Sequence, residues 1–208
     1  LELAFRQLKE KLENEGLFDI GAKKEIPNLP KKIALVTSAT SAALQDMLKV
    51  VKSRWKLSEI YIFDALTQGE SAPSSLIKAL RRADKYGVDV IVLARGGGSK
   101  EDLWCFNDEG LAREIYATKT PVISAIGHEI DYVISDFVAD RRSLTPSAAM
   151  LDLLPDEEAF FQYLDRLSDD LDSALNLKIT KKQNLLNLLL SKFSSNALKA
   201  RIELKFSE

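Results

Sequence analysis

The feature that most limits the fold of this chain is an alternation, across residues 31–150, of short apolar runs with amphipathic stretches. The runs are rich in Ile and Val and are not interrupted by alternating polar residues, which is typical of strands buried on both faces of a parallel sheet. They occupy residues 33–37, 60–63, 88–94, 121–125 and 137–139. The stretches between them place apolar residues on one helical face, in 42–54, 74–86 and around 111–116. This alternation predicts an α/β domain: an open, mainly parallel sheet with flanking helices in three layers.

The sequence on either side of this region is helical in character. Residues 1–30 carry loosely helical apolar spacing and end in prolines, and we interpret them as a helix and linker arriving from an upstream domain. Residues 156–208 contain no Gly and repeat apolar residues every three or four positions, which predicts long α-helices, in a coiled coil or a helical hairpin. The predicted domains are therefore 1–30, 31–155 and 156–208.

Composition excludes several classes of protein. With 46% hydrophobic and 29% charged residues, the chain has the balance of a soluble globular protein. A single Cys allows no internal disulfide, a single His excludes a His-based metal cage, and no apolar run approaches the roughly 20 residues that span a bilayer. The net charge of −2 gives no general basic surface for nucleic acid, so a site for a polyanion has to be built locally.

The strongest chemical motif directly follows the run at 88–94. Arg95 precedes three glycines, Gly96, Gly97 and Gly98, and then Ser99. Glycines let backbone N–H groups converge on an anion, Arg95 adds a cation suited to phosphate, and a helix beginning near Ser99 would add its positive end. We interpret the motif as a phosphate cradle, the alternative being a flexible turn. It does not match G-x-x-x-x-G-K-[ST], so no ATPase is indicated.

Two further polar clusters follow other predicted strands. His128 and Asp131 come shortly after residues 121–125 and lie three positions apart, so one helical turn would bring them to one face. His128 is a candidate general acid or base that Asp131 could orient. The hydroxyls of Thr37 and Ser38 follow the first strand and could contact a phosphate, with Asp46 about a turn inside the next helix.

All three clusters fall at carboxyl ends of parallel strands. In flavodoxin-like and Rossmann-like three-layer folds, ligands bind at that edge, near the point where the strand order reverses. An Arg, a His, several carboxylates and an anion-binding loop would then meet in one site. Such a set suits phosphodiester hydrolysis, which requires neutralised phosphate charge, an activated water and an assisted leaving group.

The motifs resemble the large subunit of exodeoxyribonuclease VII over about residues 30–155. The resemblance is carried by Thr37–Asp46 and by three strings: RGGGSKEDLWCFN from Arg95, GHEID from Gly127 and DFVADRRSLTPS from Asp136. It implies an exonuclease subunit that hydrolyses single-stranded DNA from both ends to fragments with 5′-phosphates. It also implies a cytoplasmic enzyme, without membrane association, whose large subunit assembles with several copies of a small helical subunit.

Residue by residue, the resemblance implies catalytic roles for Asp46, Arg95, His128 and Asp131, and phosphate contacts for Gly96, Gly97 and Gly98. No cofactor is certain. A divalent ion such as Mg²⁺ is an option, with Asp46, Asp102 and Asp131 as candidate ligands, although the family resembled is not strictly dependent on divalent metal.

Two other classes of function stay open at this point. One is a non-catalytic, flavodoxin-like module that binds a phosphate-bearing ligand through Arg95 and the glycines. The other is an assembly scaffold in which residues 156–208 carry the function. Within that segment, seven acidic residues in 156–172 and seven basic residues in 176–208 form either solvated faces or a surface that docks a partner.

Overall fold

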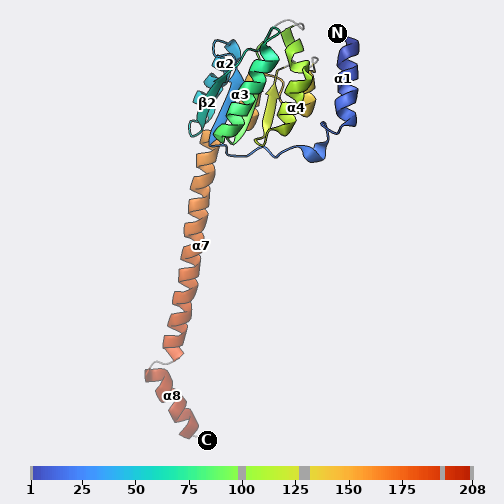
Figure 1. Ribbon diagram of the computed structural model, residues 1–208. Coiled ribbons are helices and arrows are strands. Elements are labelled where there is room, and N and C mark those ends of the chain that lie inside the picture. The colour runs from blue at the N-terminus through green and yellow to red at the C-terminus, as the bar shows by residue number, and fades with distance from the viewer. Residues whose placement is uncertain (1, 98–101, 127–131, 193–194, 207–208) are drawn as a thin grey trace. The chain divides into compact units, whose positions relative to one another are not determined.

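The computed structural model describes residues 2–97, 102–126, 132–192 and 195–206, and it divides into two compact units, Leu1–Glu157 and Glu158–Glu208. The first unit is built on a five-stranded, all-parallel sheet in the order β2-β1-β3-β4-β5 (Figure 1). The strands are β1 (Lys32–Thr37), β2 (Glu59–Asp64), β3 (Val90–Ala94), β4 (Val122–Ala125) and β5 (Arg141–Arg142). The predicted open parallel sheet is confirmed.

Helices cover both faces of this sheet, so the predicted three-layer α/β arrangement is confirmed as well. Figure 1 shows α3 and α4 side by side over one face, and α2 packs with α6. The helices of this unit are α1 (Glu2–Asn14), α2 (Ala42–Arg54), α3 (Ala72–Tyr86), α4 (Glu109–Ala117), α5 (Ile134–Val138) and α6 (Pro146–Leu153), with 3-10 helices η1 (Ile20–Ala22) and η2 (Asp102–Asn107).

The strand sequences explain why both faces are covered. In β1, Ala34 and Val36 join the core cluster that contains the apolar residues of α3 and α4, while Ile33 and Leu35 point to the opposite face. All four are fully buried. A strand whose inner residues are apolar on both faces cannot leave one face to water, which is why this sheet lies between two helical layers.

Several helices begin or end where the sequence supplies a cap. The Ser41 hydroxyl accepts a hydrogen bond from Leu44 N (3.2 Å) and begins α2, and the Asp108 carboxylate accepts one from Leu111 N (2.8 Å) and begins α4. Gly87, with φ of 77°, ends α3 in the left-handed conformation that glycine adopts without strain. These caps fix the loops at the two edges of the sheet.

The N-terminal segment packs on the sheet domain. Leu12 of α1 is fully buried in the same core cluster as α3 and α4. Lys11 pairs with Glu109 (2.8 Å), and Lys23 donates hydrogen bonds to the carbonyls of Phe137, Val138 and Ala139 (2.6–2.8 Å). The interpretation of residues 1–30 as a linker from an upstream domain stays a prediction.

The strand predicted at 137–139 is wrong. Phe137 and Val138 end the short helix α5, and the fifth strand is the dipeptide Arg141–Arg142 that follows it. The helix is favoured locally because Asp136 accepts a hydrogen bond from Val133 N at its start and Lys23 satisfies the carbonyls at its end. Neither contact is visible in the spacing of apolar residues.

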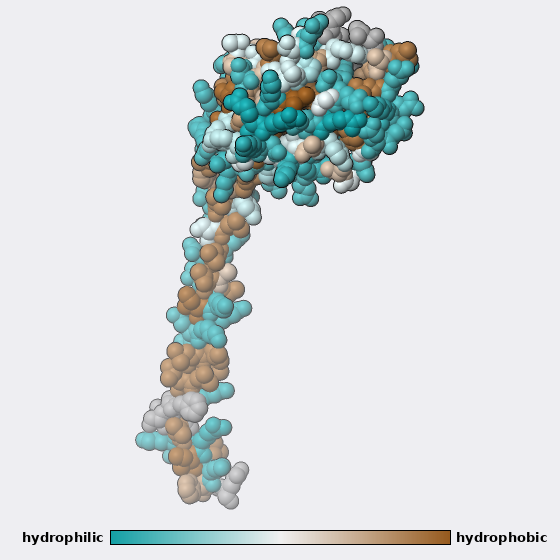
Figure 2. Space-filling model, viewed as in Figure 1, coloured by the Kyte–Doolittle hydropathy of each residue, from teal (hydrophilic) through white to brown (hydrophobic). Residues whose placement is uncertain are grey.

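The described residues from Glu157 onward form the helices α7 (Glu157–Lys192) and α8 (Ser195–Phe206), which confirms the prediction of long helices in this part of the chain. Large apolar side chains along α7 are exposed, among them Leu164, Leu167 and Leu171, and Figure 2 shows brown residues along the helix. Within the described residues, no helix is long and apolar enough to cross a membrane.

Candidate active site

The strand order reverses between β1 and β3, because the chain leaves β1 toward β2 on one side and continues from β3 to β4 on the other. Val36 pairs with Leu93, so Thr37 and Arg95 leave the sheet from neighbouring strands at the same carboxyl edge. Two of the three predicted polar clusters therefore flank the switch point, the place where ligands bind in folds of this type.

The loop after β1 is held in place by hydrogen bonds within the loop and by one to the end of β2. The hydroxyl oxygens of Thr37 and Ser41 lie 3.3 Å apart, and those of Ser38 and Thr40 are also 3.3 Å apart. At the end of β2, Asp64 accepts a hydrogen bond from Ala39 N (2.8 Å). Sequence reasoning did not identify Asp64, although its position directly after an apolar run was the available signal.

The glycine loop packs against the start of α2. A Cβ placed on Gly96 would lie 3.6 Å from the Ala43 Cβ and 3.7 Å from Ala43 N, which is ordinary van der Waals contact. The Arg95–Gly97 segment and the Thr37–Ala43 segment are therefore neighbours. The convergence of these two clusters, expected from the sheet edge, is present in the structure.

Arg95 has the most unusual environment at this edge. The residue is only 5% exposed, and its Nη2 lies 3.1 Å from Asp102 Oδ2. Its other terminal nitrogen, Nη1, is buried without a hydrogen-bond partner among the described residues. A buried charged donor without a partner is costly, so this nitrogen marks a position where an anion would be stabilised.

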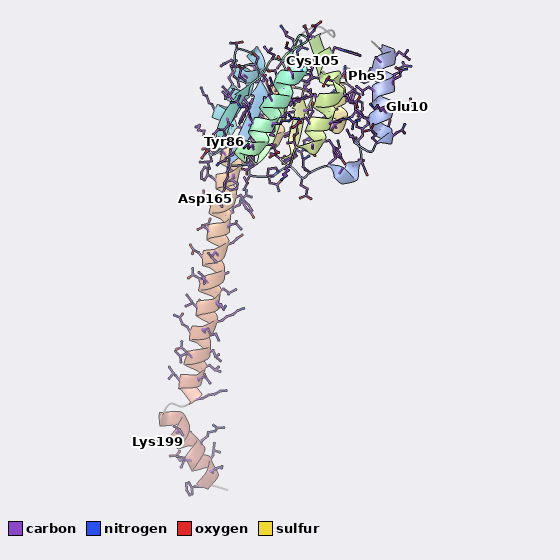
Figure 3. All side chains as sticks on the ribbon, viewed as in Figure 1. Phe5, Glu10, Tyr86, Cys105, Asp165 and Lys199 are labelled. Atoms are coloured by element: carbon purple, nitrogen blue, oxygen red, sulfur yellow. The ribbon has the colours of Figure 1, made fainter. Side chains whose placement is uncertain are left out.

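Cys105 lies beside this arginine, in η2. Figure 3 labels it at the edge of the sheet where the strands end, whereas Tyr86 lies toward the opposite edge. Burial raises the pKa of the Cys105 thiol to about 11, against the opposing effect of the positive charge of Arg95. The thiol is therefore protonated at neutral pH and is not a nucleophile there.

Asp46 lies in the second turn of α2, as expected, but its carboxylate contacts a neighbouring lysine. Its side chain is 51% exposed and pairs with Lys49 at 3.1 Å. Asp46 is three residues beyond Ala43, which contacts Gly96, so the carboxylate stands one helical turn from the glycine loop. A role in orienting water or another side chain stays a prediction for Asp46.

Four predicted site residues, Gly98, Ser99, His128 and Asp131, lie outside the described residues. The helix expected to begin near Ser99 falls partly in the same stretch. After it, the described structure begins with the 3-10 helix η2. The roles assigned to these residues stay predictions.

The segment that contains His128 and Asp131 is bracketed by a buried polar network. Asp136, with a fully buried side chain, accepts hydrogen bonds from the Ser124 hydroxyl (2.6 Å), from Val133 N (3.2 Å) and from Arg142 Nε (3.3 Å). The Arg142 guanidinium also lies 3.9 Å from the centre of the Tyr132 ring. The network joins β4, which precedes residues 127–131, to the residues that follow them.

A second tether joins this region to η2. Ile134 N donates to Asn107 Oδ1 (2.8 Å), and the Ser135 hydroxyl donates to the Phe106 carbonyl (2.8 Å). The glycine-loop side and the His128 side of the edge are thus linked through η2 and α5. Sequence reasoning did not assign roles to Asp136 or Asn107, although both lie within the strings on which the family resemblance rests.

The described residues do not form an evident metal site. They contain no group of three or more His, Cys, Asp and Glu side chains placed to hold an ion. Of the candidate ligands, Asp102 pairs with Arg95 and Asp46 with Lys49, while Asp131 lies outside the described residues. We therefore assign no chemical step to a metal ion held by Asp46 and Asp102.

Comparison with known proteins gives one consistent result. A family model described as "Exonuclease VII, large subunit" matches residues 17–207. A protein of Campylobacter fetus subsp. fetus (strain 82-40), named "Exodeoxyribonuclease 7 large subunit", is 61% identical over 203 residues, which are 98% of this chain and 52% of that protein. A protein of the same name from Campylobacter jejuni (strain RM1221) is 55% identical, and the match covers 100% of this chain and 54% of that protein. Another, from Campylobacter lari (strain RM2100 / D67 / ATCC BAA-1060), is 58% identical, and the match covers 95% of this chain and 52% of that protein. The chain spans about half the length of the curated relatives it matches.

Proposed function

Because the chain belongs to the exonuclease VII large-subunit family, we propose that it carries the phosphodiester-cleaving site of an exonuclease that acts on single-stranded DNA. The cleavage proceeds from both ends of the strand and leaves short fragments with 5′-phosphates. The family match favours this function over a phosphate-binding module without activity and over a scaffold.

The observation that carries the proposal is the burial of Arg95 together with its incomplete set of hydrogen-bond partners among the described residues. The side chain is buried at the switch point of the sheet, is held on one side by Asp102, and has a second terminal nitrogen without a partner among the described residues. A scissile phosphate placed there would accept the unused hydrogen bond and offset the buried positive charge. The adjoining backbone of Gly96 and Gly97 brings further N–H groups to the same edge.

The chemical roles follow from this placement. Arg95 and the amides of Gly96–Gly98 hold the phosphate and stabilise the negative charge that develops in the transition state. His128 acts as general base toward the attacking water or as general acid toward the leaving oxygen. Asp131 and Asp46 orient His128 or the water. Thr37, Ser38 and Ser99 contact the phosphate oxygens from the surrounding loops.

The subunit works in an assembly. Several copies of a small helical subunit bind the large subunit, and the complex is cytoplasmic. The exposed apolar residues of α7, such as Leu164 and Leu171, supply a surface of the kind that partner helices cover.

The experiment that tests this function is cleavage of end-labelled single-stranded DNA by the complete large subunit with its small partner. Wild type is compared with His128→Ala and with Lys78→Ala, an exposed lysine of α3 that serves as control. We expect cleavage by wild type and control, and its loss in His128→Ala with folding unchanged. A chelator added to each reaction tests dependence on a divalent ion. Tight binding of a small phosphate ligand with no strand cleavage would support the non-catalytic module instead.

A further inference from the structure

A cleft with a volume of about 510 Å³ opens beside the Arg95 site, at the same edge of the sheet. One side is formed by the loop before α3 and its first turn, and the other by η2 and the start of α4. Its lining residues are Gly69, Glu70, Pro73, Trp104, Cys105, Asn107, Asp108 and Glu109. The volume falls in the range of sites that hold a small organic group.

The cleft and the proposed phosphate position share the 3-10 helix η2. Asp102, the partner of Arg95, and Trp104 are both residues of this 3-10 helix. They are two residues apart, which at the rise of a 3-10 helix is about 4 Å along its axis. The ion pair that holds Arg95 and the Trp104 wall of the cleft therefore belong to the same short element.

The walls of the cleft suit a flat ring. Trp104 is partly exposed, and Pro73 at the start of α3 adds a second rigid apolar residue to the lining. A partly exposed indole ring in a cleft is a typical platform for base stacking, because every base presents a π-face to it.

The polar groups of the cleft disfavour the binding of a phosphate there, in addition to the one proposed at Arg95. Glu70, Asp108 and Glu109 all line it, so an anion inside would meet several carboxylates. Asp108 is engaged with Leu111 N and Glu109 with Lys11, which leaves these two acids structural rather than poised to share a cation. The cleft therefore favours an uncharged ligand.

Asn107 contributes its side-chain NH₂ group to the cleft as a hydrogen-bond donor. Its Oδ1 accepts a hydrogen bond from Ile134 N, so the amide is oriented and its NH₂ group is the part left for other partners. Together with the carboxylate of Glu70 as an acceptor, this gives a donor and an acceptor in one cleft. The edge of a nucleobase carries the complementary groups.

We propose that this cleft receives an unstacked nucleobase of the DNA strand, stacked on Trp104, next to the phosphate held by Arg95. The inference rests on the proposed function and adds a base subsite to it. Stacking is sequence-tolerant, so the subsite would anchor single strands of any sequence and would exclude a duplex whose bases are paired and stacked.

The test uses the complete large subunit with its small partner and single-stranded oligonucleotides that carry one abasic residue, moved position by position along the strand. In wild type, we expect KM to rise about 5- to 150-fold when the missing base is the one at the cleft, which is the range for loss of one stacked base. Abasic residues elsewhere should have smaller effects. This arm needs no variant, so it does not depend on how a substitution folds.

Variants of Trp104 then assign the effect to the cleft. Trp104→Ala should raise KM for intact DNA by a similar factor and abolish the penalty of the abasic position, and Trp104→Phe should restore both. Trp104→Leu, which keeps apolar volume without a flat ring, should behave like Ala. The matched control is Tyr116→Ala, an exposed aromatic residue near the other end of α4.

The possible failures are distinguishable. If the wild-type complex cleaves no single-stranded DNA, both the proposed function and this subsite are refuted. If it cleaves normally but Trp104→Ala leaves KM unchanged, or the abasic penalty persists in that variant, the base subsite alone is refuted. Inhibition by free deoxynucleosides without any position-dependent abasic penalty would show a site for free nucleosides and would also overturn the proposal.

Discussion

Arg95 Nη2 lies 3.1 Å from Asp102 Oδ2, and this ion pair orients a guanidinium whose second terminal nitrogen has no hydrogen-bond partner among the described residues. Asp102 is 40% exposed, whereas the arginine is nearly buried. The pair therefore holds a cation beneath the surface with one side left for a ligand. The buried Nη1, which has no partner among the described residues, makes the residue suitable for binding phosphate.

Asp136 should be essential for the stability of the sheet domain. Its buried carboxylate accepts hydrogen bonds from Ser124 and Val133 N and pairs with Arg142. Asp136→Ala leaves these donors unpaired and should lower the free energy of unfolding by about 3–5 kcal/mol. Urea denaturation measures the change. Asp152→Ala, at an exposed position of α6, should stay within about 0.5 kcal/mol of wild type, and equal effects of the two variants would contradict the role of the network.

Lys23 should stabilise α5. Its ammonium group donates to three carbonyls at the end of that helix. Burial lowers the pKa of Lys23, and the negative charge of Asp140 partly opposes this effect. We expect Lys23→Met to lower the free energy of unfolding by about 1–3 kcal/mol. Lys78→Met serves as the exposed control in the same thermal or urea titration, and an unchanged midpoint for Lys23→Met would disprove the cap.

Asp84 gives the domain an acid-dependent contribution to stability. Burial acts to raise the pKa of Asp84, but hydrogen bonds from the Thr120 backbone and hydroxyl outweigh it and hold the pKa below the ordinary value of 3.8. A carboxyl with a lowered pKa in the folded state stabilises the protein above pH 3.8, and this stabilisation is lost as the pH falls through the folded-state pKa.

Asp84→Asn should therefore be less stable than wild type at pH 7, by up to about 1 kcal/mol, and the difference should shrink below pH 3.8. Urea unfolding midpoints at pH 7, 5 and 3 measure it. A difference that is the same at all three values would show that the charge of Asp84 is not involved.

Cys105 should react slowly with alkylating agents. With a thiol pKa of about 11, only about one thiol in a thousand is ionised at pH 8, and the side chain is also buried. The rate of iodoacetamide labelling, followed by mass spectrometry, should rise about tenfold for each pH unit toward that pKa as long as the protein stays folded. Rapid labelling of the native protein at pH 7 would contradict the buried, protonated thiol.

Much of the fold was predictable because burial on both faces leaves a strong trace in the sequence. Within these runs, residues 33–36 and 90–94 have no polar residue to place on a solvent face, and the strand–helix alternation leaves few topologies. The short elements were not predictable. Residues 137–139 resemble an apolar strand, but hydrogen bonds made by Asp136 and Lys23 draw them into a helix.

The site was predictable in part. Arg95, Gly96 and Thr37 were placed correctly at one edge because parallel strands end on the same side of a sheet. The buried Arg95 Nη1 without a partner among the described residues could not be predicted, since it depends on the folded position of the side chain and of Asp102. The same holds for Asp136, whose partners Ser124 and Arg142 lie 12 and 6 positions away.

The most direct test of the central claim, that Arg95 holds the scissile phosphate, is chemical rescue. Arg95→Ala should fold, because Asp102 is partly exposed, and should lower cleavage of single-stranded DNA about 100- to 1,000-fold. Guanidinium chloride at a concentration below that which unfolds the complex should restore part of the activity by occupying the vacated position, and sodium chloride at equal ionic strength should not. Undiminished cleavage by Arg95→Ala would contradict the account.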